Sequence, residues 1–140
     1  MSIRSIFQVQ PTGTKVSLVV LMVRFVAGLA FVMHGFPKIQ NPMGWMGPEA
    51  TVPGVFQFLA ALSEFIGGMF WMVGLLTPLA SVGIFCTMSV AIYFHAMVHG
   101  DPFVGRGASY ELALVYLTIS MLLYTFGPGK FSADRILFKS

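Results

Sequence analysis

Two ionisable side chains, Arg24 and Glu64, lie well inside apolar stretches of this 140-residue chain. In hydrocarbon such a side chain costs about 2.5 to 3.5 kcal/mol on insertion scales, so each is expected to have a partner and is a functional candidate. The guanidinium fork of an arginine matches the two oxygens of a carboxylate. We therefore predict that Arg24 and Glu64 form a buried pair. The pair either only fixes the register of two helices or also borders a ligand site.

A second polar group gathers near the ends of the apolar stretches. Its members are His34, Lys38, His95, His99 and Glu111. Because histidine titrates near neutral pH, we expect an outward-opening cluster that hydrogen-bonds a head group or exchanges protons with it. His95 and His99 are four residues apart and share a helix face, as two metal ligands can. No cysteine cluster or paired glutamate motif accompanies them, so we expect no metal site, with His34, His95 and His99 as the weaker alternative.

The composition indicates which elements must position these residues. Hydrophobic residues make up 56% of the chain and charged residues 9%, whereas soluble domains carry about 25% charged residues. A soluble globular enzyme and a disordered chain are both excluded. Four apolar stretches, at about 16–36, 55–76, 79–98 and 109–126, have nearly the length that crosses a bilayer. The sequence predicts a single all-α domain over residues 1–140, a membrane-spanning four-helix bundle.

The distribution of basic residues predicts the orientation of this bundle. Five stand on the side of the termini: Arg4, Lys15, Lys130, Arg135 and Lys139. Only Lys38 and Arg106 stand in the opposite loops, so the positive-inside rule places both termini in the cytoplasm. A net charge of +3 is too small and too scattered for a nucleic-acid surface, and we expect no nucleic-acid partner.

Small residues and turn residues add two local expectations. Gly67 and Gly68 in the second stretch favour close helix packing over a groove for a flat head group. The Gly-Pro-Gly segment at 127–129 ends the fourth stretch, and Ser132 is then placed to cap a short helix.

Several of these residues, in this order and spacing, resemble the signatures of the DoxX family of four-helix membrane proteins. The first-span resemblance lies in Arg24, Gly28, Phe31, His34, Gly35 and Lys38. The second-span resemblance lies in Glu64, Gly67, Gly68 and the segment 74–77. Further similarity lies in the polar positions His95 and Glu111 and in a C-terminal signature of residues 127–129, Ser132 and Asp134.

The resemblance implies a multi-pass protein of a prokaryotic cytoplasmic membrane. The family is named after a subunit of a thiosulfate:quinone oxidoreductase, and other members have been linked to quinone or thiol redox stress and to membrane oxidoreductase complexes. The sequence has no flavin or dinucleotide fingerprint, cysteine pair or convincing haem ligand set, so a partner or the quinone itself must carry electrons.

Our leading expectation is therefore a quinone-interacting membrane subunit or accessory protein. The expected quinone-site residues are Arg24, His34, Lys38, Glu64, His95 and Glu111. The expected partners are the lipid bilayer, oxidoreductase subunits and, as an open alternative, a second copy of the chain. Two other functions remain open. One is a structural anchor that recruits a soluble enzyme through the tail 131–140, and the other is a small-solute or proton carrier.

Overall fold

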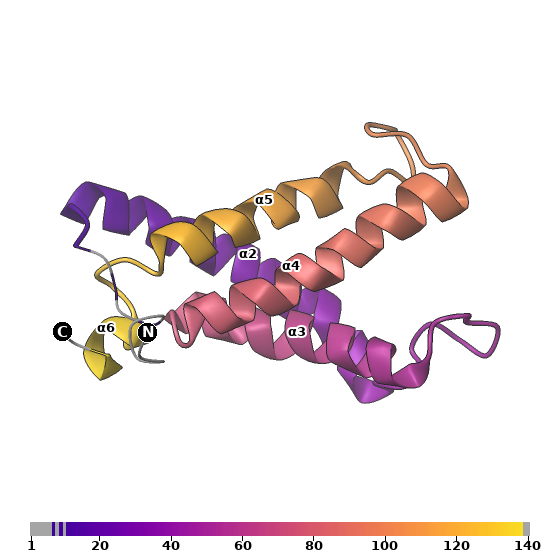
Figure 1. The fold of residues 1–140 in the computed structure, drawn as a ribbon, viewed down its shortest axis with the longest axis horizontal. Coiled ribbons are helices and arrows are strands. Elements are labelled where there is room, and N and C mark those ends of the chain that lie inside the picture. The colour runs from indigo at the N-terminus through magenta and orange to yellow at the C-terminus, as the bar shows by residue number, and fades with distance from the viewer. Residues whose placement is uncertain (1–6, 8, 10, 139–140) are drawn as a thin grey trace.

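The computed structural model describes residues 7, 9 and 11–138, which form helices and no strands. The helices are α2 (Thr14–Gln40), α3 (Gly54–Val73), α4 (Thr77–Tyr93), η1 (Phe94–His99), α5 (Glu111–Phe126) and α6 (Ala133–Leu137) (Figure 1). The predicted all-α class is confirmed. α2, α3 and the continuous segment Thr77–His99 are long and apolar enough to cross a membrane, whereas α5 has 16 residues.

The first helix is longer than its apolar stretch predicts. An end near residue 36 was expected, because Pro37 follows, but α2 continues through Pro37 to Gln40. A proline removes one backbone donor and disturbs the preceding turn. So close to the C-terminus of the helix, this loss is tolerated, and one further turn forms. That turn places Lys38 on the helix instead of in a loop.

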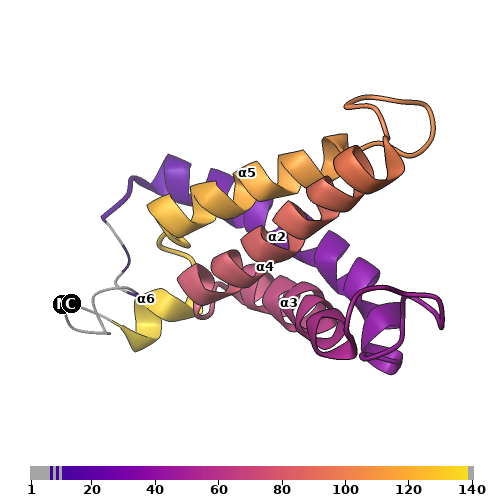
Figure 2. The same cartoon turned by 45° about the vertical axis from the view of Figure 1, so that its right-hand side comes forward.

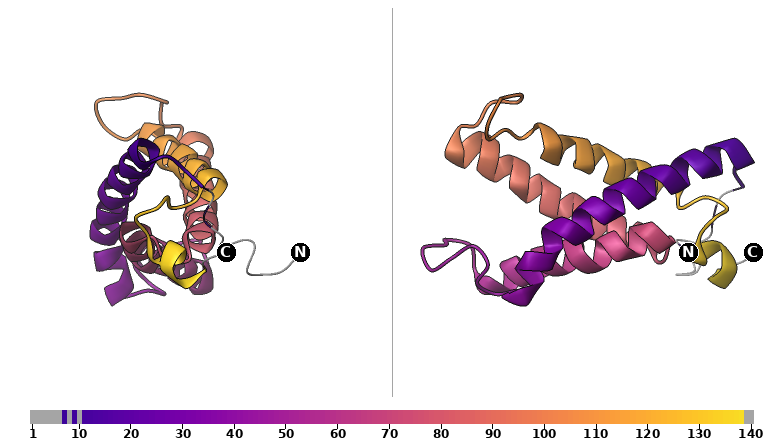
Figure 3. Two further views of the ribbon diagram at one scale, coloured as in Figure 1. Left: turned by 90° about the vertical axis from the view of Figure 1, so that its left-hand side faces the viewer. Right: turned by 180° about the vertical axis from the view of Figure 1, so that it is seen from behind.

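The four long helices form two antiparallel hairpins, α2 with α3 and α4 with α5, and α3 also packs on α4. α2 and α4 cross, so the hairpins spread apart at the end that carries the loops 41–53 and 100–110 (Figures 1 and 2). We call this the loop end. At the opposite end, the terminal end, the segment that leads to α6 lies across the bundle (Figure 3).

Helices α2 and α3 approach closely through small residues. A Cβ atom on Gly28 would lie 2.6 Å from the carbonyl oxygen of Gly68, and one on Gly68 would lie 2.7 Å from that of Gly28. Gly67 faces Ile84 of α4 at ordinary contact distance. These contacts confirm the packing interpretation of Gly67 and Gly68.

An aromatic cluster forms the core between the hairpins. Phe31 is buried between Trp71, with ring centroids 5.6 Å apart and edge-to-face, and Tyr116, with centroids 4.7 Å apart. The indole Nε1 of Trp71 donates a hydrogen bond to Ser81 Oγ at 3.0 Å. Large apolar side chains are instead exposed on the outer faces of the helices, as in Val26, Met33 and Leu122, which suits a lipid surrounding.

Candidate functional site: a pocket at the loop end

Glu64 pairs with Lys38, so the predicted pair with Arg24 is wrong. Lys38 Nζ lies 2.7 Å from both carboxylate oxygens of Glu64. The Glu64 side chain is 4% exposed and that of Lys38 is 24% exposed. The carboxylate is therefore sealed in the bundle, while the lysine still reaches the surface.

The register of α2 against α3 explains why Glu64 pairs with Lys38 and not with Arg24. Gly28 faces Gly68, and Gly35 lies against the backbone of Glu64 and Phe65. This antiparallel register brings Arg24 level with Met72, whose carbonyl oxygen it contacts at 3.5 Å. Eight residues separate Met72 from Glu64, about 12 Å along the helix. The additional turn after Pro37 supplies Lys38 at the height of Glu64.

The loop 41–53 covers this ion pair. The ring of Trp45 has its centroid 4.4 Å from Lys38 Nζ, which is within the range of a cation–π contact. Trp45 Nε1 donates to the carbonyl oxygen of Gln57 at 2.9 Å. The Gln57 side chain accepts from the Met46 amide at 3.1 Å and donates to the Val52 carbonyl at 2.8 Å. The loop is thereby held against the first turns of α3.

A pocket of about 240 Å³ opens between the hairpins beside the ion pair. Its polar lining residues are His34, Lys38, Glu64, His95, Ser109 and Tyr116, and its apolar lining residues are Phe31, Met88, Ala91, Leu112 and Ala113. The structure thus brings together four of the six predicted site residues. His34 is exposed and has no hydrogen bond to any other side chain in the described part of the chain.

The other two predicted residues do not line this pocket. Glu111 is exposed in the first turn of α5, where the positive end of the helix dipole stabilises a carboxylate. Arg24 is fully buried at the terminal end. It donates to the carbonyl oxygens of Pro128 and of Phe131, the latter at 2.9 Å. Arg24 therefore holds the C-terminal segment against the bundle.

Asp134 completes this arrangement at the terminal end. Its carboxylate accepts hydrogen bonds from the backbone amides of Leu76 at 2.7 Å and Thr77 at 2.9 Å. Its own amide donates to Gly74 at 2.9 Å. Asp134 thus caps α4 from a distant part of the sequence, a role that sequence reasoning did not assign. One signal in the sequence pointed to a cap from elsewhere in the chain: Leu76, at the N-cap of α4, has no side-chain acceptor of its own.

Ser132 takes the role that the sequence predicted for it. It is the N-cap of α6, and its hydroxyl oxygen accepts a hydrogen bond from the Arg135 amide at 3.3 Å. α6 thus begins at a capped N-terminus, and the contacts of Phe131 and Asp134 hold this segment against the bundle.

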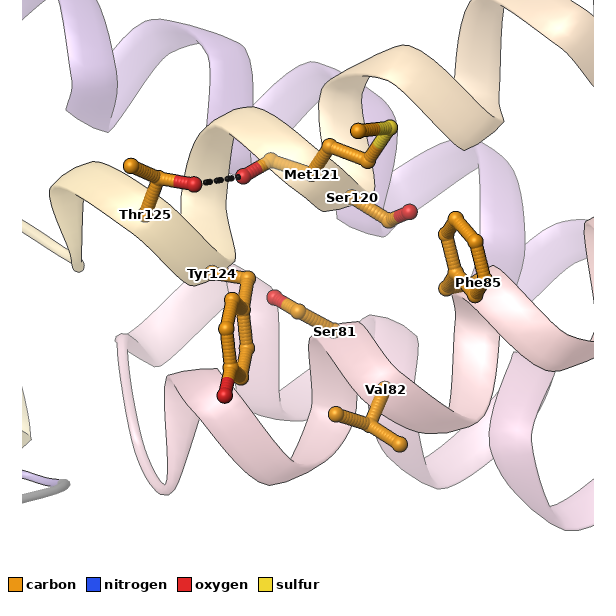
Figure 4. Close-up of a pocket in the computed structure, with 7 residues that line it drawn as sticks. All are labelled: Ser81, Val82, Phe85, Ser120, Met121, Tyr124 and Thr125. Atoms are coloured by element: carbon orange, nitrogen blue, oxygen red, sulfur yellow. Dashed lines mark hydrogen bonds between the residues drawn. The ribbon is translucent and has the colours of Figure 1, made fainter.

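A second cavity of about 240 Å³ lies between α4 and α5 (Figure 4). It is lined by Ser81, Val82, Phe85, Ser120, Met121, Tyr124 and Thr125, none of which is a carboxylate, histidine or lysine. The Ser120 and Thr125 hydroxyls donate to backbone carbonyls of their own helix at 2.6 and 2.8 Å. Although the two cavities have the same volume, the loop-end pocket differs in being lined by histidine, lysine and glutamate side chains.

Comparison with known proteins agrees with the fold. The DoxX family model matches residues 19–99, which include α3, α4, η1 and most of α2. An uncharacterized protein of Haemophilus influenzae is 27% identical over 118 residues, 83% of this chain and 88% of that protein. The inner membrane protein YqjF of Escherichia coli K12 is 33% identical over 132 residues, 86% of this chain and 92% of that protein. No solved structure matches.

Proposed function

Because the chain belongs to the DoxX family, we propose that this multi-pass membrane protein binds the head group of a membrane quinone in its loop-end pocket. In this proposal it is a membrane subunit or accessory protein of an oxidoreductase system. Its termini lie in the cytoplasm, and the pocket opens on the outer side of the membrane.

The observation that carries the proposal is the combination of groups in one pocket. Ligand pockets are mostly apolar with a few polar groups that orient the ligand. A quinone ring is flat and apolar and has carbonyl oxygens that accept hydrogen bonds. His34, Lys38 and His95 supply donors, while Phe31 and Leu112 supply apolar surface. The volume of about 240 Å³ suits a head group whose isoprenoid tail stays in the lipid.

The pocket residues also suit proton exchange. Reduction of a quinone to a quinol takes up two electrons and two protons, and imidazoles can transfer protons near neutral pH. His34 and His95 line the pocket, beside the place proposed for the quinone ring. The electrons come from a partner enzyme in this proposal, since the sequence carries no redox motif of its own.

The test uses two phenylalanine substitutions that fill cavities of equal volume. We expect protein purified gently with its native lipids to carry an isoprenoid quinone at close to one per chain, measured by mass spectrometry. Ala113→Phe fills the loop-end pocket and should reduce the quinone to background. Val82→Phe fills the other cavity and should leave it in place. Background quinone in the unmodified protein, or full retention in Ala113→Phe, would contradict the proposal.

The two alternative functions stay predictions with tests of their own. In the described part of the tail, Ile136 and Leu137 are exposed whereas Ser132 and Asp134 are buried, so an anchor function is tested at the exposed pair. Substituting these two residues should then release a bound soluble partner without affecting quinone. A carrier should show solute or proton uptake in proteoliposomes.

A further inference from the structure

The loop end carries a second cluster of chemically active groups, centred on the π-helical turn η1. His95 and His99 lie on this turn, and Asp101 follows it. His95 Nδ1 lies 2.6 Å from Asp101 Oδ2, and His99 Nδ1 lies 4.0 Å from the same oxygen. One ligand atom from each of the three side chains lies within 4.8 Å of the other two. Single π-turns are often found at functional sites.

The backbone brings the aspartate back toward the two histidines. Gly100 adopts a left-handed conformation with φ of 71°, which an L-residue with a side chain rarely adopts. The chain then reverses, and the Asp101 amide donates to the carbonyl oxygen of His95 at 2.8 Å. The approach of the carboxylate to the imidazoles is therefore supported by main-chain geometry.

We infer that His95, His99 and Asp101 form a binding site for a divalent transition-metal ion of the zinc class. Two imidazoles and one carboxylate suit Zn²⁺, Co²⁺ or Ni²⁺, whereas Mg²⁺ and Ca²⁺ prefer sites made of oxygen ligands. This inference does not rest on quinone binding, although the two sites share His95. It also replaces the weaker sequence alternative, in which His34 was the third ligand, by a set in which Asp101 is the third ligand.

The observed distances are close to those that a metal ion needs. Tetrahedral coordination at about 2.0 to 2.1 Å separates the ligand atoms by about 3.3 Å. The distance of 2.6 Å between His95 and Asp101 must widen slightly, and that of 4.0 Å between His99 and Asp101 must shorten slightly. The side chain of His99 is 58% exposed and that of His95 38% exposed, so both can turn and an ion can enter from solution.

Three protein ligands leave a coordination position open, as in catalytic zinc sites. His95 also lines the loop-end pocket. A metal ion held by the three ligands thus sits at the border of that pocket, where its open position can take water or an oxygen atom of a small ligand.

The experiment titrates Co²⁺ into the full chain in lipid nanodiscs, purified with a tag that contains no histidine and stripped with chelator. We expect saturable visible absorption from one Co²⁺ per chain that Zn²⁺ displaces, and none from empty nanodiscs. His99→Ala and Asp101→Asn should each weaken binding at least about tenfold. His34→Ala is the matched control and should bind as the unmodified chain does.

The variants distinguish a site built from these three side chains from loose association of cobalt with the protein surface. No saturable Co²⁺ binding in the unmodified chain would overturn the inference, as would unchanged binding in both His99→Ala and Asp101→Asn. Loss of binding in His34→Ala would overturn the ligand assignment. His99 is exposed and Asp101 lies in a loop, so both variants should fold, which their unfolding curves will check. No quinone is added to the titration, so its outcome is separate from that of the proposed function.

Discussion

The two ends of the bundle use buried charge in different ways. At the terminal end Arg24 is fully buried, and it donates to backbone carbonyls of the C-terminal segment. Asp134 caps α4 with both carboxylate oxygens. At the loop end the Glu64 side chain is nearly buried, and it lines a pocket together with Lys38, His34 and His95. The first end is closed by the protein's own chain, and the second is left open.

This difference indicates which intramembrane charges are available to a ligand. The fork of Arg24 is directed at fixed backbone carbonyls, so a ligand would have to displace the C-terminal segment to reach it. His34 makes no such hydrogen bond within the described residues, and Lys38 contacts the Glu64 carboxylate and the Trp45 ring. An ionisable residue inside a membrane helix is therefore a functional candidate only after its internal partners have been identified.

The largest effect should come from Arg24→Met, which removes the link between α2 and the C-terminal segment. We expect a loss of about 3 to 6 kcal/mol of stability, because the carbonyl oxygens of Pro128 and Phe131 each lose a charged donor at about 1.5 to 3 kcal/mol per hydrogen bond. Unfolding in mixed detergent and SDS micelles, followed by tryptophan fluorescence, measures it. Arg24→Lys should recover only part of the loss, because a lysine cannot reproduce the planar fork.

Two further observations sharpen that prediction. Limited proteolysis should cut the segment 127–138 of Arg24→Met, but not of the unmodified protein. Arg106, an exposed arginine in the loop 100–110, is the matched control. Arg106→Met should leave both the unfolding curve and the proteolysis pattern unchanged. If Arg24→Met unfolds like the unmodified protein, the terminal end is not held by this side chain.

The ion pair at the loop end should respond unequally to removal of its two partners. Lys38→Met leaves the nearly buried Glu64 unpaired and should cost about 2 to 3 kcal/mol. Glu64→Gln leaves the ammonium of Lys38, which is partly exposed and still contacts Trp45, and should cost about 1 kcal/mol. The double variant should be more stable than Lys38→Met alone, which a double-mutant cycle measures. Equal losses in the two single variants would contradict the expectation that the difference in burial between Lys38 and Glu64 sets the cost.

The long helices and their small-residue contacts were accessible from the sequence because hydropathy and glycine placement are local properties. The partner of Glu64 could not be predicted from the sequence. It depends on the register between α2 and α3, which the contact of Gly28 with Gly68 sets across two helices, and on the turn that α2 continues after Pro37. A shift of that register by two helical turns would bring Arg24 close to Glu64, so the residue types alone did not identify the pair.

The two aspartates were missed for a related reason. Asp134 reaches the start of α4 only because the C-terminal segment folds back across the bundle. Asp101 reaches His95 only because Gly100 takes a left-handed conformation. Both contacts depend on loop conformations that periodicity does not encode. The sequence 99–101, a histidine, a glycine and an aspartate close to His95, was a weak signal for the second.

Replacing one aspartate at each end of the bundle compares the two ends through smaller expected losses of stability. Asp134→Ala leaves the amides of Leu76 and Thr77 without their acceptor and should cost about 1 to 2 kcal/mol, as for loss of a helix N-cap. Asp101→Asn at the loop end should change stability by no more than about 0.5 kcal/mol, because the side chains it contacts, His95 and His99, are 38% and 58% exposed and exposed pairs contribute little. The same unfolding assay measures both. A larger loss for Asp101→Asn would show that its contact with His95 is part of the fold.

The smallest effect on stability is expected for His34→Ala, and this variant tests whether the loop end is built for a ligand. His34 is exposed, lines the pocket and has no side-chain partner among the described residues, so its removal should change stability by less than about 0.5 kcal/mol. If the pocket binds a quinone head group, the same variant should lower the quinone that co-purifies, because a donor is lost. Loss of ligand without loss of stability is the combination that a purely structural histidine cannot produce. Loss of stability with quinone retained would instead make His34 part of the packing and leave the two ends of the bundle alike.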